Sequence, residues 1–421
     1  MRPHPDNSSP SAASPAAQVL TRVCAILEAC QDGKPLPKQS DSESGPLLHN
    51  ILLCICRHRA SLDFLLDTFR TGKLRPRIRR VLWWALAEML WLDGLPVPVI
   101  VDTAITFIKR RYSLADASFS NALLRKIALL QEQDRLADLL SQAPAAVRLE
   151  LPEVLYQRWA KTFAPAALAK LAELLQQPAE IILRARKNGL GEIIPAGLQE
   201  LSAPPWAGDC RLFRLGKAKL AEILSTGEDF YVQDPSTLLA PAMLAVRPGE
   251  QVGDLCSAPG GKALFLAEHL DGEGRLICRD RSEARLGRVR ENLRFWTNVE
   301  IAHGDARQPD LPPGSLDALL LDVPCSNTGV IRRRPDVRWT FKEKKLRELV
   351  ELQRQILTST APLLRPGGRL VYSTCSLEEE ENHLQVQDFL GRRADYVLLS
   401  QRQLPITSEH DGAYSALLQR K

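Results

Sequence analysis

Two cysteines of this chain follow apolar segments in a way that suggests one shared reactive site. Residues 316–321 lead into Asp322 and then Cys325, and residues 370–372 lead into Cys375. Short apolar runs that end in turn residues are typical of buried strands. Because open α/β sheets bind ligands at the carboxyl ends of their strands, we expect both thiols and the carboxylate to meet at one sheet edge. The pattern predicts thiol chemistry there.

The remaining cysteines are interpreted differently. A small buried hydrophobic residue is the usual alternative for any cysteine, and it is our interpretation of Cys24, Cys30, Cys54, Cys56, Cys210 and Cys278. The chain has nine cysteines, an odd number without framework spacing, so we expect free thiols in a reducing compartment. Cys54 and Cys56 are too close for the usual zinc pair and lack a second pair, so we expect no metal site.

A glycine-containing turn at residues 254–262 is a second candidate site. It reads Asp-Leu-Cys-Ser-Ala-Pro-Gly-Gly-Lys. Paired glycines let a ligand approach the backbone closely, and the helix that follows offers free N–H groups. The turn lacks the G-x-G-x-x-G spacing, which disfavours hydride transfer, and a plain tight turn is the alternative. Asp280 follows the next predicted strand and is placed to accept hydrogen bonds from ribose hydroxyls, and Asp305 follows the third strand, where an adenine edge would lie.

Alternating strands and helices through residues 229–421 must position these candidates. The predicted strands are residues 251–255, 275–278, 299–302, 316–321, 369–372, 397–399 and 414–418, and the predicted helices are residues 263–270, 285–295 and 344–364. Strands separated by helices of this length predict a mostly parallel sheet. The last two strands fit a sheet with one antiparallel edge member.

The first part of the chain is predicted to be an all-α bundle. Between residues 19 and 125, apolar residues recur mostly at intervals of three and four, the period of an amphipathic helix. We interpret Trp83, Trp84 and Trp91 as packing residues rather than as platforms for stacked bases. Residues 1–16 are rich in proline, serine and alanine, and we expect a disordered lead there.

The overall charge favours anionic partners mildly. The chain has 421 residues, a net charge of +5 and a pI near 8.7. One basic run, residues 73–80, fits a solvated face as well as an RNA contact, whereas Arg332, Arg333 and Arg334 are predicted to contact phosphate. No segment reaches the roughly 18 apolar residues of a membrane span, and the N-terminus lacks the apolar core of a signal peptide. We therefore expect a cytoplasmic protein that acts as a monomer, without membrane contact.

Several motifs resemble those of the bacterial 16S rRNA cytosine-5 methyltransferases that carry a fused NusB-like N-terminal domain. Residues 322–330 (DVPCSNTGV) are similar to that family's proline-cysteine motif, and residues 373–376 (STCS) to its threonine-cysteine-serine motif. Residues 257–262 (SAPGGK) are similar to its nucleoside-turn motif, and residues 92–96 and 119–125 resemble its helical RNA-binding domain. Asn327 stands where the family usually has glycine, and asparagine tolerates a positive φ better than most residues.

The resemblance implies a multi-domain protein: a NusB-like all-α bundle at residues 17–145, a connecting region or small RNA-recognition subdomain at 146–228, and an α/β Rossmann-like class I methyltransferase domain at 229–421. It also implies that S-adenosyl-L-methionine is the cofactor. By position, the implied cofactor-binding residues are Cys256, Ser257, Ala258, Pro259, Gly260, Gly261, Lys262, Asp280, Asp305 and Asp322.

In the family, a thiolate adds to C6 of cytosine and so makes C5 nucleophilic enough to take a methyl group. The resemblance implies that Cys375 is this nucleophile and that Cys325 assists release of the methylated product. DNA cytosine-5 methyltransferases instead attack with the proline-cysteine thiol, so the assignment depends on the second cysteine being present. An ordinary thiol, with a pKa of about 8.5, needs a favourable environment for this chemistry at neutral pH.

We therefore expect an S-adenosylmethionine-dependent RNA cytosine-5 methyltransferase, with 16S rRNA as the expected substrate. The same chemistry on tRNA or another rRNA site is the nearest alternative. A non-catalytic RNA-binding assembly factor is an alternative from another class, and the intact pair of cysteines argues against it. A methyltransferase for small molecules or proteins would need neither paired thiols nor a basic helical domain.

Overall fold

The computed structural model describes residues 14–31, 36–37, 45–70, 72–92, 94–187, 194–216, 220–225 and 229–421. Of the lead expected at residues 1–16, residues 1–13 lie outside this set, and the first helix begins at Pro15. The chain divides into two compact units. We call Met1–Gln176 with Arg334–Thr340 the helical unit, and Gln177–Arg333 with Phe341–Lys421 the sheet unit.

The described part of the helical unit contains no strand, as the apolar spacing predicts. Its helices are α1 Pro15–Gln31, α2 Gly45–Arg57, α3 Arg59–Phe69, α4 Pro76–Leu90, α5 Val97–Arg111, α6 Leu114–Glu132, α7 Arg135–Ser141, α8 Ala145–Arg148, α9 Glu153–Thr162, α10 Pro165–Gln176 and α15 Val337–Thr340. Helix α4 begins with Pro76 at a first-turn position, where the missing N–H breaks no intrahelical bond.

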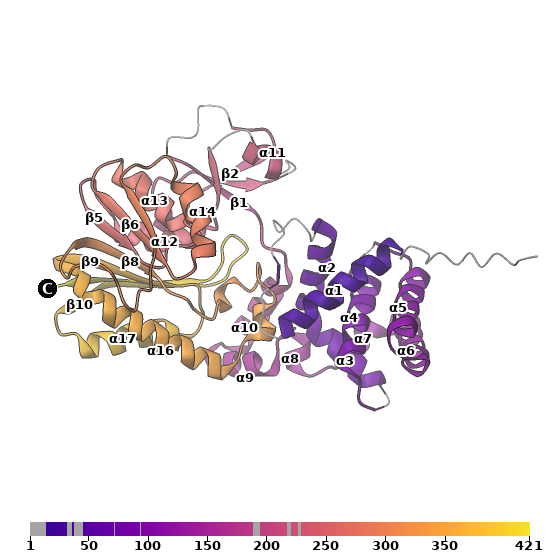
Figure 1. The fold of residues 1–421 in the computed structure, drawn as a ribbon. Coiled ribbons are helices and arrows are strands. Elements are labelled where there is room, and N and C mark those ends of the chain that lie inside the picture. Colours follow the sequence, from indigo (N-terminus) through magenta and orange to yellow (C-terminus); the bar gives the residue numbers. More distant parts are fainter. Residues whose placement is uncertain are drawn as a thin grey trace, which may run out of the picture. The chain divides into compact units, whose positions relative to one another are not determined.

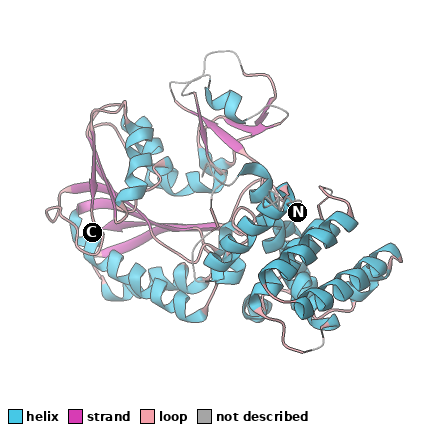
Figure 2. Ribbon diagram, turned by 45° about the vertical axis from the view of Figure 1, so that its right-hand side comes forward, coloured by secondary structure: helices cyan, strands magenta, loops and turns pink. Residues whose placement is uncertain are grey.

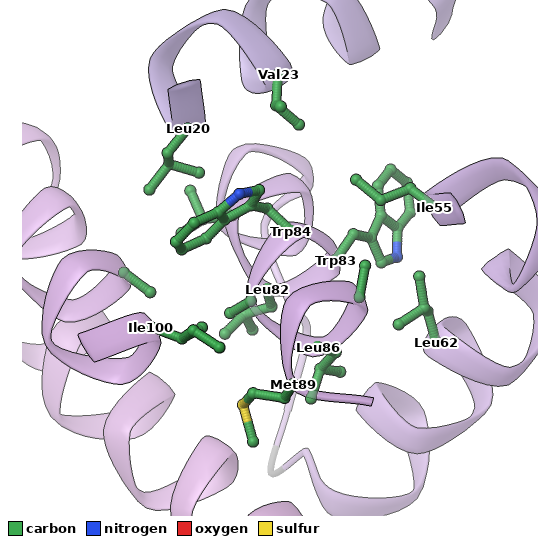
Figure 3. Close-up of a cluster of buried hydrophobic side chains, with 14 of the residues drawn as sticks. Leu20, Val23, Ile55, Leu62, Leu82, Trp83, Trp84, Leu86, Met89 and Ile100 are labelled. Carbon is green, nitrogen blue, oxygen red and sulfur yellow. The ribbon is translucent and has the colours of Figure 1, made fainter. Parts of the chain in front are cut away.

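Helix α4 is the centre of the helical core. It packs against α1, α2, α3, α5 and α6. Trp83 and Trp84 are buried among aliphatic side chains of the neighbouring helices (Figure 3). The indole Nε1 of Trp83 donates to Asp63 Oδ1 at 2.9 Å, which satisfies its polar atom. The interpretation of these two tryptophans as packing residues is confirmed.

The segment Arg334–Thr340 is bound into the helical unit through backbone carbonyls. Arg338 is fully buried and donates to the carbonyl oxygens of Glu150 at 2.9 Å and Leu175 at 2.6 Å. Burial lowers the pKa of Arg338 to about 10. Trp339 Nε1 donates to the carbonyl oxygen of Cys56 at 2.7 Å. These bonds hold a short insert from the second half of the sequence against helices from the first half.

The prediction that the arginine run contacts phosphate is wrong for Arg332, and all three side chains have partners within the protein. Arg332 is buried and donates to the carbonyl oxygens of Thr407 and Pro178. Arg333 forms ion pairs with Asp234 at 2.6 Å and Asp411 at 2.7 Å. Arg334 pairs with Asp336 at 2.8 Å. The buried Arg332 is not available to a polyanion, whereas the side chains of Arg333 and Arg334 are 30% and 40% exposed.

The sheet unit contains a small antiparallel sheet in the connecting region. Its strands are β1 Ile182–Ala185, β2 Leu198–Leu201, β3 Leu212–Leu215 and β4 Phe230–Val232, in the order β2-β3-β1-β4, with helix α11 at Leu220–Ser225. Arg184 on β1 is buried and donates to Gln233 at 2.8 Å and to Glu268 on α13 at 2.5 Å. This buried ion pair joins the small sheet to the larger one's helical layer.

The large sheet has seven strands in the order β10-β11-β9-β8-β5-β6-β7. They are β5 Gln251–Asp254, β6 Arg275–Asp280, β7 Val299–His303, β8 Leu316–Asp322, β9 Leu364–Thr374, β10 Tyr396–Leu404 and β11 Ala413–Arg420. Strands β5 to β9 pair in parallel, and β11 is antiparallel to both β9 and β10. We expected the antiparallel strand at the edge of the sheet. The antiparallel strand is β11, and it lies one position inside the edge, because β10 pairs with its outer side.

Helices cover both faces of the large sheet, which explains its nearly continuous apolar strands. Helices α12 Leu239–Leu244, α13 Gly261–Leu270 and α14 Glu283–Leu293 lie on one face, and α16 Glu343–Thr360 and α17 His383–Arg392 on the other (Figures 1 and 2). Along β8, Leu319 and Leu321 pack toward the α16 side, whereas Ala318 and Leu320 pack toward α13 and α14. The predicted multi-domain class, a helical bundle followed by a Rossmann-like α/β fold, is confirmed.

Candidate active site

The two motif cysteines meet at the carboxyl end of neighbouring parallel strands. Strands β8 and β9 pair with Asp322 opposite Ser373, so the segments that follow them leave the sheet side by side. Cys325 Sγ lies 3.3 Å from Cys375 Sγ. Both cysteines are free thiols. The hydrogen bond to Cys375, reinforced by burial, raises the pKa of Cys325 well above that of an ordinary thiol.

A buried carboxylate holds the two cysteine loops together. Glu381 lies in the short turn η5 Glu379–Glu381 and is completely buried. It accepts hydrogen bonds from the backbone N–H of Ser326 at 2.9 Å, from Ser326 Oγ at 2.5 Å and from Gln353 Nε2 at 3.0 Å. Gln353 also donates to the carbonyl oxygen of Pro324 at 2.9 Å. Burial raises the pKa of Glu381, while its hydrogen bonds act in the opposite sense.

The loop after β8 needs glycine at position 329 because backbone atoms surround it. A Cβ on Gly329 would lie 2.5 Å from the carbonyl oxygen of Gly412 and 2.9 Å from that of Cys375. The N–H of Gly329 donates to the carbonyl oxygen of Cys375 at 2.9 Å, which ties the two cysteine loops directly. The glycine of the DVPCSNTGV motif is therefore explained by close approach of the backbone.

The predicted cofactor turn joins β5 to α13. Two of its N–H groups face the next strand: Ser257 N–H donates to the carbonyl oxygen of Arg279 at 2.9 Å, and Ala258 N–H donates to Asp280 Oδ2 at 3.1 Å. Gly261 has no room for a side chain, because a Cβ there would lie 2.8 Å from Cε1 of Tyr231. The turn and Asp280 thus form one hydrogen-bonded assembly.

Charged groups lie close to the thiols. Lys262 Nζ forms an ion pair with Asp322 Oδ2 at 2.6 Å. Burial by itself would lower the pKa of Lys262, but the Asp322 carboxylate raises it overall. Asp254, at the end of β5, is buried, and burial together with the charge of Asp322 raises its pKa to about 7. Asp305 differs, because hydrogen bonds from Arg307 lower its pKa to about 2.

These residues surround a cavity of about 460 Å³. It is lined by the predicted site residues Cys256, Ala258, Asp280, Asp305, Asp322, Cys325 and Cys375. The remaining predicted residues, Ser257, Pro259, Gly260, Gly261 and Lys262, belong to the turn behind this lining. Cys256 is buried enough that burial, with the nearby Asp254 carboxylate, raises its pKa well above that of an ordinary thiol, in keeping with a lining role.

Sequence reasoning missed several lining residues. Leu349, Leu352 and Ile356 from α16 form an apolar wall, and Asn327, Arg281 and Ser282 also reach the cavity. Leu349, Leu352 and Ile356 follow the helical spacing of three and four, which by itself indicates only a packed helix face. Nothing in that spacing separates a residue that packs on the sheet from one that lines a cavity.

The cavity fits S-adenosylmethionine in size and in chemistry. Ligand pockets for molecules of this class enclose roughly 300–1,000 Å³. The cofactor carries a sulfonium and an ammonium group, and the acidic side chains of Asp280, Asp305 and Asp322 line the cavity. Among the described residues, the buried Asp254 carboxylate has no side-chain hydrogen-bond donor, so it would favour a nearby cationic ligand.

The residues that the structure describes include neither a metal-binding cluster nor a membrane-spanning helix. Within them, no cluster of three or more His, Cys, Asp or Glu side chains is arranged to hold a metal ion. Likewise, none of the described helices combines the length and apolar character needed to cross a bilayer.

Comparisons with known proteins match both units. The family described as 16S rRNA methyltransferase RsmB/F matches residues 241–418, and the NusB family matches residues 14–129. Ribosomal RNA small subunit methyltransferase B of Escherichia coli O17:K52:H18 is 32% identical over 92% of this chain and 93% of that protein. A protein of Synechocystis, described as a probable ribosomal RNA small subunit methyltransferase B, is 30% identical over 81% of this chain and 80% of its own length.

The fold is also found in a solved structure, that of PH0851. Its TM-score is 0.76 at 22% identity, and the match covers 96% of this chain and 99% of that one. The family matches cover the helical region and the α/β region separately, and the relative from Escherichia coli spans both. The chain belongs to the 16S rRNA methyltransferase RsmB/F family.

Proposed function

We propose that this S-adenosylmethionine-dependent methyltransferase modifies C5 of a cytosine in 16S rRNA, with Cys375 as the nucleophile and Cys325 as the group that assists product release. The observation that carries the proposal is the 3.3 Å contact between the two sulfur atoms at the edge of the cofactor-sized cavity. The printed names of the relatives support 16S rRNA as the substrate.

The chemistry needs two thiols with different tasks. The Cys375 thiolate forms a bond to C6 of cytosine, and the electron pair of the C5–C6 double bond makes C5 nucleophilic. S-adenosylmethionine supplies an electrophilic methyl group. A base then takes the proton from C5, the double bond re-forms, and the C6–S bond breaks to return the Cys375 thiolate. We assign the proton removal to Cys325.

The electrostatics support this division of tasks. In the free protein, the hydrogen bond to Cys375 is the main reason that the pKa of Cys325 is raised. Once the sulfur of Cys375 is bonded to carbon, it no longer carries the charge that opposes ionisation of Cys325. Formation of the adduct therefore makes Cys325 a better source of a thiolate base than it is beforehand.

Other residues position the reactants. Asp322 pairs with Lys262 and lines the cavity beside both cysteines. A carboxylate there is suited to accept a hydrogen bond from the exocyclic amino group of a cytosine that has left its stack. Asp280 is suited to the ribose hydroxyls of the cofactor and Asp305 to its adenine side, as the sequence predicts.

The helical unit is proposed to bind RNA. Arg77, Lys109, Arg110 and Arg111 are exposed, and we call them the basic cluster. Arg77 lies over the ring of Tyr112 at 4.7 Å, and Tyr112 directly follows the three basic residues that end α5.

We assign residues 17–145 to a NusB-like RNA-binding domain, 146–228 to a small RNA-recognition subdomain and 229–421 to the methyltransferase domain. The free state of all nine cysteines supports action in the reducing cytoplasm, and we propose a monomer.

A denaturing gel of Cys325→Ala and Cys375→Ala, expressed in bacteria, tests the division of tasks. Cys325→Ala should carry a slow-migrating, ribonuclease-sensitive RNA adduct, because it attacks but cannot release. Cys375→Ala and the control Cys210→Ala should carry none. Sequencing of the trapped RNA names the substrate, and tRNA in place of 16S rRNA would overturn the assigned target.

Two other outcomes would contradict the proposal. An adduct on Cys375→Ala alone would reverse the roles of the thiols. If neither variant forms an adduct and the wild type makes no 5-methylcytosine, the protein acts as a non-catalytic assembly factor.

A further inference from the structure

Helix α14 contacts the predicted cofactor turn through one of its faces. The guanidinium of Arg285 donates to the carbonyl oxygen of Ala258. Two helical turns later, Asn292 Nδ2 donates to the carbonyl oxygen of Pro259 at 2.9 Å. Residues seven positions apart lie on the same side of a helix. The carbonyl groups of two consecutive turn residues therefore accept hydrogen bonds from a single face of α14.

Between these two hydrogen bonds, the turn lies directly on the backbone of the helix. A Cβ on Gly260 would lie 3.1 Å from Cα of Val289 and 3.1 Å from Nδ2 of Asn292, so a side chain there would require the turn or the helix to move. Val289 lies four residues after Arg285 and three before Asn292, on the same face. Three successive residues of the turn thus meet three successive positions of one helix face.

Asp280 holds the turn through its N–H groups. Ala258 N–H donates to Asp280 Oδ2 at 3.1 Å, and the N–H of Ser282, directly before α14, donates to Asp280 Oδ1 at 2.9 Å. Asp280 lines the cavity and is the residue proposed to bind the ribose hydroxyls of the cofactor. A shift of the turn on α14 would therefore displace Asp280 or break its hydrogen bond with Ala258.

Asn292 differs from Arg285 in its relation to the cavity. Arg285 lines the cavity, so it is placed to contact a ligand itself. Asn292 is not among the lining residues, and its NH₂ group has two acceptors in the protein: the Pro259 carbonyl oxygen and, at 3.4 Å, the hydroxyl oxygen of Tyr231. A carbonyl oxygen can only accept, so the NH₂ end of the amide must face the turn. An effect of Asn292 on a ligand must consequently be transmitted through the turn.

We propose that Asn292 is a positioning residue whose amide holds the turn of residues 257–261 in the shape that binds S-adenosylmethionine. The role of Asn292 rests on the proposed assignment of this turn and Asp280 to the cofactor. Without the amide, the Pro259 carbonyl loses its donor on α14, and the turn no longer has a fixed position against Asp280. The expected consequence is weaker cofactor binding by a protein that is still folded.

Calorimetric titration of the protein with S-adenosylmethionine, in the absence of RNA, tests the proposal. Asn292→Asp keeps the size of the side chain but replaces the NH₂ donor with an oxygen that repels the Pro259 carbonyl. The turn must then shift, and the dissociation constant should rise about tenfold or more. Asn292→Ala removes the donor without adding repulsion and should raise the dissociation constant about threefold to tenfold.

A second ligand separates the shape of the turn from the charge of the variant. S-adenosylhomocysteine has the same nucleoside but no sulfonium charge, so a shift of the turn should weaken both ligands by the same factor. The negative charge that Asn292→Asp adds would by itself favour the cationic ligand, which is opposite to the expected loss. Thr297→Asp adds the same charge at an exposed position beyond the end of α14 and should leave both affinities unchanged.

Unchanged affinities for both Asn292 variants would overturn the proposal, and so would a loss confined to S-adenosylmethionine. A purely structural role would lower the melting temperature of the cofactor-free variants but leave the affinity of the folded protein, measured well below that temperature, at the wild-type value. If Asn292→Asp does not fold, Asn292→Ala decides alone. A wild type that binds neither ligand would instead contradict the proposed cofactor site itself, so the two failures are distinguishable.

Discussion

Asp254 is a buried carboxylate whose ionisation opposes folding of the cofactor-free protein. Its pKa is raised to about 7, by burial first and then by the negative charge of Asp322. The folded protein therefore holds this proton more tightly than the unfolded chain does. Its stabilising effect is complete below pH 4 and is lost as the pH rises toward 7, because a charge must then be buried. A cationic ligand would offset this effect.

Asp254→Asn should remove this pH dependence. The variant should melt several degrees above the wild type at pH 8, and the difference should shrink as the pH falls to 5, because the wild-type carboxyl is then neutral. Thermal unfolding of the cofactor-free protein measures the difference in melting temperature at pH 8 and its decrease toward pH 5. Asp305→Asn is the control, since Arg307 already lowers the pKa of that carboxyl to about 2 and no gain at pH 8 is expected. A lower melting temperature for Asp254→Asn at pH 8 would contradict the assignment.

Asp254 should also contribute to the affinity of the protein for its cofactor. Asp254→Asn should weaken binding of S-adenosylmethionine at pH 8, where the wild type offers a buried anion to a cationic ligand, and calorimetry measures the change. The expected loss is at least tenfold, since an interaction with a charged group contributes about 1.5–3 kcal/mol. Equal affinities for wild type and variant at pH 8 would separate Asp254 from the cofactor site.

At the scale of elements, the site is held by contacts between loops that follow different strands. Glu381 in η5 joins the loop after β8 to α16, and Gly329 brings that loop onto the backbone of Cys375. Thr374 Oγ1 donates to Asn382 Oδ1 at 2.6 Å, and Asn382 Nδ2 donates to the carbonyl oxygen of Ser376 at 2.9 Å. The spacing of the two thiols is therefore a property of several connected elements.

Glu381→Gln should weaken this assembly. A glutamine offers one acceptor oxygen where the carboxylate offers two, so its NH₂ group would face the donors of Ser326 or Gln353. We expect a loss of about 1–3 kcal/mol in the free energy of unfolding, measured with denaturant, and a larger proportional loss of adduct formation. Glu379→Gln, at an exposed position of the same turn, should change neither the free energy of unfolding nor the amount of adduct.

Gly329→Ala should also disturb the loops. The added methyl group meets backbone oxygens rather than flexible side chains, so the loops must separate, and we expect a loss of about 1–3 kcal/mol in the free energy of unfolding. Gly391→Ala is the matched control. Among the described residues, no atom lies within 4 Å of a Cβ at Gly391 in α17, so alanine should leave stability unchanged or raise it by about 0.5–1 kcal/mol. Equal stabilities for Gly329→Ala and wild type would show that the loops are free to move.

At the scale of the whole molecule, the chain combines a chemically equipped α/β unit with a helical unit that carries an exposed basic cluster. Arg332 is buried, and Arg333 and Arg334 form ion pairs within the protein, so fully exposed basic residues are better placed to bind RNA phosphates. The basic cluster is the proposed place. Exposed lysine and arginine side chains that neutralise phosphates release counterions, so their contribution is read from the salt dependence of binding.

Replacing the whole basic cluster with alanine should lower both RNA affinity and its salt dependence. With Arg77, Lys109, Arg110 and Arg111 removed, the slope of log K against log salt should fall by about 0.7–0.9 for each lost phosphate contact. Filter binding of a 16S rRNA fragment across salt concentrations measures it, and cofactor affinity should stay the same. Arg354→Ala with Arg392→Ala is the control, because both residues pair with acids on their own helices. Unchanged slopes would place the RNA contact elsewhere.

The sequence by itself determined the site's composition, because local patterns specify it. An apolar run followed by Asp322 and Cys325 predicts a strand that presents these side chains at a sheet edge, and the run before Cys375 does the same. The alternation of strands and helices likewise predicts a mostly parallel sheet.

Only the tertiary structure decided which polar groups pair. The arginine run was predicted to contact phosphate, but Arg333 forms ion pairs with Asp234 and Asp411, which are far away in the sequence. Only the tertiary structure also decided three other features. These are the position of β11 between β10 and β9, the apolar wall from α16 and the contact of Asn327 with Cys375. Periodicity records which face of an element is buried, whereas a hydrogen bond depends on the placement of two groups to within a fraction of an ångström. That placement is a property of the folded chain.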